Sequence, residues 1–167
     1  MKLIDTKPSF LLDLRGLLHI NEIFTQFRLC EYQHSRKRHV LVDALGLVLG
    51  VVVTPADTTE RDGAKAVLGR VLTWLTWLRL LWVDGGYTGA TFANWVKALR
   101  PKLAVQVVKR SDDVRGFKVL PRRWVVERTF GWLMHHRRLV RDYERTITSA
   151  EAFVYLAMIR IQLRRLA

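Results

Sequence analysis

A single aspartate stands where a short apolar run meets a glycine-rich turn. The run Leu78–Val83 ends abruptly at Asp84, and Gly85-Gly86-Tyr87-Thr88-Gly89 follows. This composition requires a turn, so a strand carries Asp84 to its tip. Open α/β sheets bind ligands at the carboxyl ends of their strands, and two glycines let a ligand approach closely. Asp84 is therefore a candidate ligand-binding carboxylate. The alternative is that Asp84 only caps the turn.

Glu127 is the candidate partner of Asp84, because it lies in a dense mixture of aromatic and cationic residues. On one continuous helix, steps of 4, 7 and 4 place Arg123, Glu127, Met134 and Arg138 on a single face. That face would present a carboxylate between guanidinium groups. The alternative is a surface ion pair between Arg123 and Glu127, which contributes only a few tenths of a kcal/mol.

The two carboxylates together predict metal-dependent phosphoryl chemistry. Carboxylate oxygens from a strand tip and a neighbouring helix are ligands that Mg²⁺ prefers. Two such ions about 4 Å apart can activate the attacking oxygen and stabilise the leaving oxygen of an in-line displacement. Flanking arginines would hold the nucleic-acid backbone. Two carboxylates supply few ligands for two metal ions, so a third carboxylate from another strand is expected.

The composition indicates a globular protein with a polyanionic partner. The 167 residues include 28 Lys or Arg and 15 Asp or Glu, a formal net charge of +13, and 50% are hydrophobic. A chain this apolar can build a core, which excludes a basic disordered tail, and its length predicts one domain. Residues 100–167 hold 16 of the basic and 6 of the acidic residues. The excess charge therefore lies in the C-terminal part, where it favours binding to phosphate backbones.

Three further features limit the cellular context. Cys30 is the only cysteine, so the chain has neither an intrachain disulfide nor a four-cysteine zinc site. Asp13 and Arg15 interrupt the N-terminal apolar stretch, unlike a secretory signal. The stretch Ala44–Ala56 has 13 uncharged residues, fewer than the roughly 20 needed to span a bilayer. We therefore expect a cytoplasmic protein without a membrane span.

The hydrophobic pattern from residue 39 onward predicts a mixed-sheet α/β domain in the order β-β-α-β-α-β-α-α. The expected elements are strands His39–Asp43 and Leu47–Thr54, helix Glu60–Trp77, strand Leu78–Val83, helix Ala90–Leu99, strand Leu103–Arg110, and helices Arg122–Arg138 and Ser149–Arg165. Thr58 or Thr59 is expected to cap the first helix. We expect Trp74 and Trp77 to join the core. Residues Asn21–Phe27 are compatible with a helix.

Four blocks of sequence, in order, resemble the DDE transposases of bacterial insertion sequences, in the subgroup usually called IS-four/IS-five. The blocks are Lys37–Leu47, Pro55–Asp57 with Arg61–Ala64, Trp82–Tyr87, and Gly116–Leu133. The similarity runs from about residue 36 to the C-terminus. Asp-Gly-Gly-Tyr at residues 84–87 and Val-Glu-Arg-Thr-Phe at residues 126–130 make it specific when taken together.

This resemblance implies an RNase H-like mixed sheet flanked by helices, with strand cleavage and transfer at transposon ends. It implies a site of two Asp and one Glu that binds Mg²⁺ or Mn²⁺, with two ions if the triad is complete. It maps the second Asp onto Asp84 and the Glu onto Glu127. Arg123 matches a family arginine, and Arg128, Arg137 and Arg138 are further candidates for DNA contacts.

The family's first Asp has no clear match, because no Asp-Ser strand followed by a polar, glycine-rich stretch precedes Arg36. Asp5 directly follows the apolar residues Leu3 and Ile4 and is the first candidate for this catalytic Asp. Asp13 is the second candidate. Asp43 belongs to the matching hairpin and is not expected to be a ligand. We therefore expect residues 1–35 to be an atypical N-terminal segment, residues 36–167 to form the catalytic domain, and the first strand to be degenerate or missing, as in a truncated copy.

The leading hypothesis is a transposase catalytic domain that binds insertion-sequence ends and target DNA in the bacterial nucleoid, with a homodimer as a candidate assembly. The runner-up is a catalytically dead transposase remnant that only binds DNA. A basic RNA-binding or ribosome-associated protein would explain the charge of residues 100–167. It would leave the Asp-Gly-Gly-Tyr and Val-Glu-Arg-Thr-Phe blocks without a role.

Overall fold

A computed structural model describes residues 23–25, 36–108 and 124–166 of the chain. The elements are β1 (Ile23–Thr25), β2 (Arg36–Val42), β3 (Val48–Pro55), α1 (Glu60–Val71), β4 (Leu80–Asp84), the short 3₁₀ helix η3 (Gly85–Tyr87), α2 (Ala90–Leu99), β5 (Ala104–Val108), α3 (Trp124–Met134), α4 (Arg137–Val140) and α5 (Ile147–Leu166). The predicted order of strands and helices from residue 39 is therefore confirmed, apart from the division of one helix described below.

Strands β2 and β3 form the predicted hairpin, paired antiparallel from Arg36 opposite Pro55 to Val42 opposite Val48. Gly46 makes the turn possible with a φ of 82°, a conformation that residues with a side chain rarely adopt. Asp43 stabilises the turn, because its Oδ1 accepts the N–H groups of Leu45 and Leu47 at 2.8 Å each. Its burial raises the pKa of this carboxyl, and those backbone N–H groups oppose the rise. As expected, Asp43 belongs to the hairpin.

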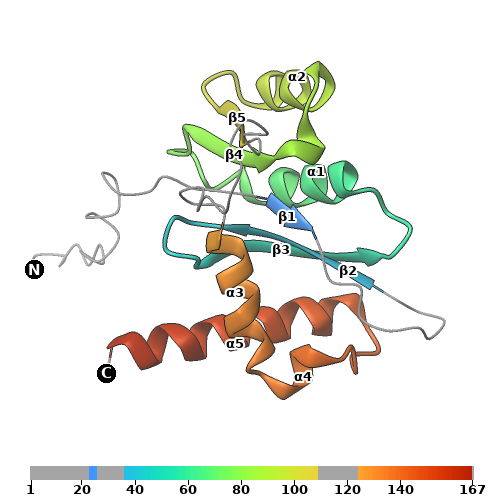
Figure 1. Cartoon of the computed structure of the whole chain (residues 1–167), viewed down its shortest axis with the longest axis vertical. Coiled ribbons are helices and arrows are strands. Elements are labelled where there is room, and N and C mark those ends of the chain that lie inside the picture. The colour runs from blue at the N-terminus through green and yellow to red at the C-terminus, as the bar shows by residue number, and fades with distance from the viewer. Residues whose placement is uncertain (1–22, 26–35, 109–123, 167) are drawn as a thin grey trace, which may run out of the picture.

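The remaining strands build a second, parallel pair beside the hairpin. Strand β4 pairs with β5 from Leu80 opposite Ala104 to Asp84 opposite Val108. Strand β1 pairs antiparallel with β2 and also contacts β4, so it joins the two sheets (Figure 1). This strand has three described residues in the place where the resemblance implied a degenerate or missing strand. The helix considered for Asn21–Phe27 is wrong at residues 23–25, because backbone pairing with β2 makes them a strand.

Two hydrophobic clusters cover the two faces of the hairpin (Figure 1). On one face, Leu41 and Val52 pack with apolar residues of α1, β4 and α2. On the other face, Val40 and Val51 pack with apolar residues of α3 and α5. Because successive side chains of a strand alternate between faces, a strand that is covered on both sides is apolar throughout. This double burial explains the continuous apolar runs in β2 and β3.

Helix α1 begins as predicted but ends six residues early. Thr59 is the N-cap, and its Oγ1 accepts the N–H of Asp62 at 3.2 Å. The helix stops at Val71, and the Arg100 guanidinium donates to carbonyls of the segment that follows, those of Leu72, Leu75 and Thr76. The prediction that Trp74 and Trp77 join the core is wrong. They lie in the turns after α1, 55% and 36% exposed.

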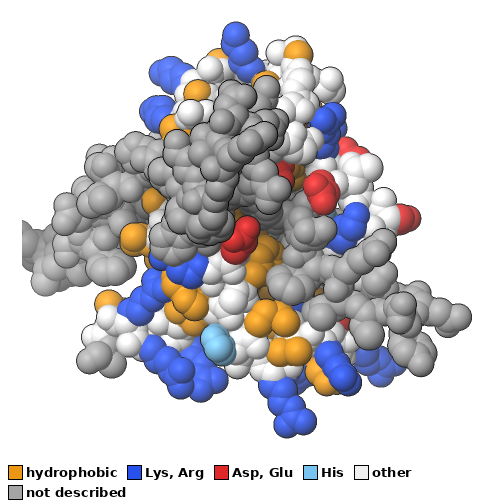
Figure 2. Space-filling view, in the orientation of Figure 1, with side chains coloured by type: hydrophobic (Ala, Val, Ile, Leu, Met, Phe, Trp, Pro, Cys, Tyr) orange, Lys and Arg blue, Asp and Glu red, His pale blue; other side chains and the backbone are white. Residues whose placement is uncertain are grey.

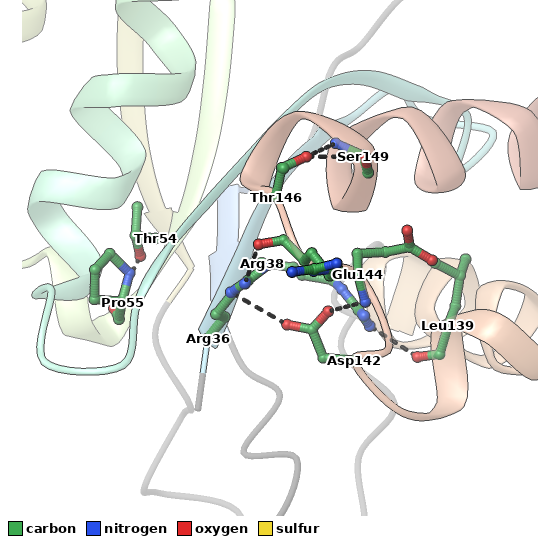
Figure 3. Close-up of polar contacts among 10 residues, drawn as sticks. Arg36, Arg38, Thr54, Pro55, Leu139, Asp142, Glu144, Thr146 and Ser149 are labelled. Atoms are coloured by element: carbon green, nitrogen blue, oxygen red, sulfur yellow. Dashed lines mark hydrogen bonds and ion pairs between the residues drawn. The ribbon is translucent and has the colours of Figure 1, made fainter. Parts of the chain in front are cut away.

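The single helix predicted over Arg122–Arg138 is divided within its described part. Helix α3 ends at Met134, and His136 has an extended backbone before α4 begins. This break lets Leu139 reach the core, where its carbonyl accepts a hydrogen bond from Arg38 Nη1 at 2.8 Å (Figure 3). Arg36 similarly binds Asp142 at 3.5 Å. Contacts from β2 thus fix the segment between α3 and α5.

The break also corrects the predicted stripe of Arg123, Glu127, Met134 and Arg138. Arg138 lies on α4, so it does not continue the face of α3 that carries Glu127. Arg123 lies outside the described residues.

In the described part of the chain, no helix is both long and apolar enough to cross a bilayer.

Candidate functional site

Asp84 lies at the carboxyl end of β4, as the sequence predicted. It is half-buried and caps η3, with Oδ1 accepting the N–H of Gly86 at 2.9 Å. Among the described residues the space beside Gly85 is clear, because a Cβ added there would meet none of their atoms within 4 Å. The turn therefore holds the carboxylate and leaves room beside the backbone. Asp84 therefore caps the turn, and its binding of a ligand stays a prediction.

The N-terminus of α1 fixes the turn that follows Asp84. The guanidinium of Arg61 donates to the carbonyl of Gly86 at 3.1 and 3.2 Å, and to that of Thr88 at 3.0 Å. Tyr87 is buried, and its hydroxyl donates to the carbonyl of Glu60 at 3.2 Å. These bonds join two segments that lie over twenty residues apart. Asp84 therefore has a defined position relative to the first turn of α1.

Glu127 lies on α3, which is anchored on the β2–β3 turn. Thr129 is fully buried, and its Oγ1 donates to the carbonyl of Gly46 at 2.7 Å. Arg128 donates from Nη2 to the carbonyl of Leu45 at 2.9 Å. Glu127 itself is exposed, and no ion pair to it occurs among the described residues. The helix thus presents this carboxylate to solvent, free of the cations of the described part.

The described residues do not bring three candidate ligands together. Within them, no group of three or more His, Cys, Asp or Glu side chains is placed to hold a metal ion. Asp5 and Asp13, the candidates for the first catalytic Asp, lie outside the described ranges, as does Arg123. Strand β1, Ile-Phe-Thr, has no carboxylate in its described residues.

The arginines predicted to contact DNA differ in the contacts that they form with other residues of the chain. Arg138 forms an ion pair with Glu144 at 2.8 Å, and its guanidinium lies 4.2 Å from the ring centroid of Phe153. Its exposed neighbour Arg137 has no ion pair in the part of the chain that the structure describes. Arg128 lies over the Trp132 ring at 4.7 Å, and burial lowers its pKa. The contacts of Arg138 with Glu144 and Phe153 therefore stabilise the packing of α4, in addition to the positive charge that Arg138 contributes.

Three arginines near the end of α5 extend this positive surface, and the sequence reading did not single them out. Arg165 lies over the same Trp132 ring at 4.2 Å. The pKa of His136 is lowered mainly by burial and further by the positive charges of Arg160 and Arg164, which places those groups near it. Figure 2 shows Lys and Arg side chains gathering along the side formed by α4 and α5. The arginine spacing within the last predicted helix was the available signal.

We refer to Arg128, His136, Arg160, Arg164 and Arg165 as the basic ridge. Its members come from α3, from the turn after it, and from α5. Trp132 fixes two of the guanidinium groups, so part of the ridge is ordered before any ligand binds. Clustered like charges of this kind repel one another and favour a polyanionic ligand. The ridge is therefore a candidate nucleic-acid interface.

Comparison with known proteins gives matches over most of the chain. The family model described as a transposase DDE domain matches residues 24–162. A transposase for insertion sequence element IS402 of Burkholderia cepacia is 32% identical over 127 residues, which cover 72% of this chain and 59% of the relative. A transposase for element IS6501 of Brucella ovis is 27% identical over 136 residues, covering 78% and 99%. The chain thus spans about three fifths of the first relative's length. The predicted resemblance is confirmed.

A solved structure has a fold similar to that of this chain. The catalytic core domain of HTLV-2 integrase, in complex with magnesium and in a dimeric form, aligns with a TM-score of 0.51 at 12% identity. The alignment covers 83% of this chain and 81% of that domain. This confirms the expected RNase H-like fold.

Proposed function

Because the chain belongs to the transposase DDE domain family, we propose that it acts in DNA transposition, cleaving and transferring strands at the ends of an insertion sequence. The position of Asp84 carries this proposal. An RNase H-like fold delivers that carboxylate to the open carboxyl end of a strand, where ligands of α/β sheets bind. The basic ridge supplies the charge that a DNA substrate requires.

The residues at the tip of β4 fit a hard divalent cation. Asp84 Oδ1 is held by Gly86, while Oδ2 has no hydrogen bond from the described residues. Asp84 and Glu127 would hold Mg²⁺ or Mn²⁺, with two ions if a third carboxylate completes the set. When bound, these ions would activate the attacking oxygen and stabilise the leaving oxygen.

The chain's own residues have separate tasks in this proposal. The glycines after Asp84 place no side chain in the space that a phosphodiester would enter. The basic ridge, together with Arg123, Arg137 and Arg138, would hold phosphates of the insertion-sequence ends or of the target. Such contacts position DNA without reading its sequence. DNA binding would place the protein in the bacterial cytoplasm, associated with the nucleoid.

A second candidate function is DNA binding without catalysis. One observation favours it: the described residues contain no group of three metal-ligating side chains, and the described part of β1 has no carboxylate. A remnant of this kind would keep the basic ridge and the fold. It would bind DNA with the salt dependence expected of phosphate contacts but would cleave nothing.

We further propose a homodimer, the state given for the HTLV-2 integrase core. On α5, Leu156, Ile159, Leu163 and Leu166 follow one another at helical spacing and are 49–73% exposed. A second copy would cover this apolar face. Sedimentation equilibrium of the chain and of Leu163→Glu tests the assignment. The variant should dissociate at concentrations where the original dimerises, and a chain that is monomeric at every concentration would contradict the dimer.

Nicking of a supercoiled plasmid that carries the element's ends tests the catalytic proposal. The chain should nick this plasmid in Mn²⁺ or Mg²⁺ and leave it intact in a chelator. Asp84→Asn keeps the size and the hydrogen bond to Gly86 but removes the charge, so nicking should be lost. Asp57→Asn removes an exposed carboxylate from the loop before α1 and is the matched control. DNA binding without nicking by the unaltered chain would favour the second candidate.

A further inference from the structure

Two tryptophans are exposed in the segment between α1 and β4. Trp74 is 55% and Trp77 is 36% exposed, whereas Leu75 and Leu78, which alternate with them, are buried. An indole ring in water exposes a large apolar area, so these two rings form a surface that a ligand with apolar faces would cover. The DNA contacts proposed above do not use this surface.

The segment that carries the two rings is held in place by its own contacts. Leu75 and Leu78 pack into the core beneath it, and the N–H of Thr76 donates to the Trp74 carbonyl at 2.9 Å. From the end of α2, the Arg100 guanidinium donates to the carbonyls of Leu75 and Thr76 at 3.2 and 3.0 Å. Because the turn is already ordered, a ligand that binds it pays little for fixing its backbone.

Two guanidinium groups meet on this turn. Nη1 of Arg79 and Nη1 of Arg100 donate to the same oxygen, the Thr76 carbonyl, at 3.1 and 3.0 Å. In the part of the chain that the structure describes, neither arginine forms an ion pair, and Nε and Nη2 of Arg79 have no acceptor. Residues 64–102 hold six Lys or Arg and a single acid, Asp84, at the opposite end of β4. Two like charges so close together favour an anion beside them.

Aromatic rings and cations on one turn match the chemistry of single-stranded DNA. Unpaired bases stack on aromatic side chains whatever their sequence, and arginines bind the phosphates that link them. In a duplex the bases stack on one another, so a protein ring does not reach their faces. The net charge of +13 and the transposase family favour DNA over an acidic protein as the anionic partner.

We propose that Trp74, Trp77, Arg79 and Arg100, which we call the tryptophan patch, bind a short single-stranded segment of DNA. The patch precedes β4, and Asp84 ends that strand roughly 13 Å beyond Leu80. The basic ridge lies on α3 and α5, which cover the other face of the hairpin. The inference therefore goes beyond the proposed function, because this binding site needs neither the metal ion nor cleavage.

Fluorescence anisotropy of a labelled oligothymidine of about ten nucleotides, titrated with the full chain in a chelator, tests the assignment. Trp74→Ala and Trp77→Ala should each weaken binding by roughly fivefold or more, the loss expected for one stacked base. Trp74→Phe keeps an aromatic ring and should retain most of the affinity. Tyr143→Ala removes an equally exposed ring, 55%, from the segment between α4 and α5 and is the matched control.

Two further measurements complete the experiment. Arg79→Gln should reduce the slope of log affinity against log salt by roughly 0.7, the value for one phosphate contact on a single strand. A labelled duplex without single-stranded ends should bind Trp74→Ala and Trp77→Ala as it binds the original chain. Circular dichroism checks that each variant is folded.

The outcomes separate this inference from the proposed function. Unchanged oligothymidine affinity in folded Trp74→Ala and Trp77→Ala would overturn the inference, even if the chain nicks DNA. Equal weakening by Tyr143→Ala, or an equal loss of duplex affinity, would also overturn it, because the effect would then not be specific to stacking on the patch. Tighter binding of polyglutamate than of oligothymidine would assign the patch to an acidic protein instead. A loss confined to single strands, with no nicking by the original chain, would support the patch and contradict the catalytic proposal.

Discussion

The protonation of His39 should make folding stability depend on pH in a way that one substitution removes. His39 is fully buried on β2, and its Nε2 and Thr54 Oγ1 are hydrogen-bonded at 2.8 Å. Its Nδ1 has no partner among the described residues, and the ring lies directly under Gly63. Burial, with a smaller contribution from the charge of Lys37, lowers the pKa of His39 from 6.5 to about 4. The folded protein therefore holds a neutral imidazole.

The sign and size of the effect follow from this pKa. Between pH 6.5 and about 4 the unfolded chain binds a proton at His39 that the folded chain does not. The contribution of His39 to stability is therefore complete above pH 6.5 and is lost as pH falls towards 4. A fall from 6.5 to about 4 corresponds to roughly 3 kcal/mol. That is a large part of the stability of a small domain.

Urea unfolding of the chain and of His39→Gln, across this pH range, measures the contribution. Glutamine does not titrate but can still bond Thr54. The free energy of unfolding of the original should fall by roughly 3 kcal/mol relative to the variant between neutral pH and pH 4. Asp43 and His136 titrate in both proteins, so their contributions cancel in the difference. Parallel pH profiles for the two proteins would refute the burial of a neutral His39.

Three further predictions follow from packing and charge. Gly63→Ala places a methyl group 2.1 Å from the His39 ring, so it should destabilise the fold by about 1–3 kcal/mol or more in urea unfolding. Gly69→Ala, whose methyl group meets no described atom within 4 Å, should not destabilise it. Arg100→Met removes the guanidinium that donates to the Leu72 carbonyl and shares the Leu75 and Thr76 carbonyls with other donors, and it should cost about 1–3 kcal/mol. A change below about 0.5 kcal/mol, the usual limit for surface substitutions, would contradict this bracing role. Arg164→Gln should weaken duplex binding and reduce the slope of log affinity against log salt by roughly 1, as measured by fluorescence anisotropy, and an unchanged slope would remove it from the basic ridge.

The strands and the place of Asp84 could be predicted because each depends on local sequence. The apolar runs Val40–Val42 of β2 and Val48–Val53 of β3 are typical of strands covered on both faces. The Gly-Gly pair predicts the end of β4 without reference to its packing. The motif around Glu127 likewise identifies the family without reference to tertiary structure. Local patterns were sufficient for the order of the elements and for two candidate acids.

The features that the sequence missed depend on contacts between distant segments. Helix α1 ends early in a segment that Arg100 braces: this residue lies 28 residues beyond Leu72 and binds the Leu72 carbonyl just after the helix. Helix α3 ends before α4 in a segment that β2 braces, where Arg38 binds the Leu139 carbonyl. Helical periodicity continues through both points, so the pattern alone gives no signal of either end. The contact of Arg61 with the turn after β4 is of the same kind, because only the packed fold brings α1 beside that turn.

We propose above that Asp84 supports metal-dependent DNA cleavage. Its most direct test is the Mn²⁺-dependent nicking rate of DNA that carries the element's ends, compared between the original chain and Asp84→Asn at equal DNA occupancy. We expect nicking by the original, none in a chelator, and at most a trace with Asp84→Asn. Equal nicking by the two proteins would contradict the claim.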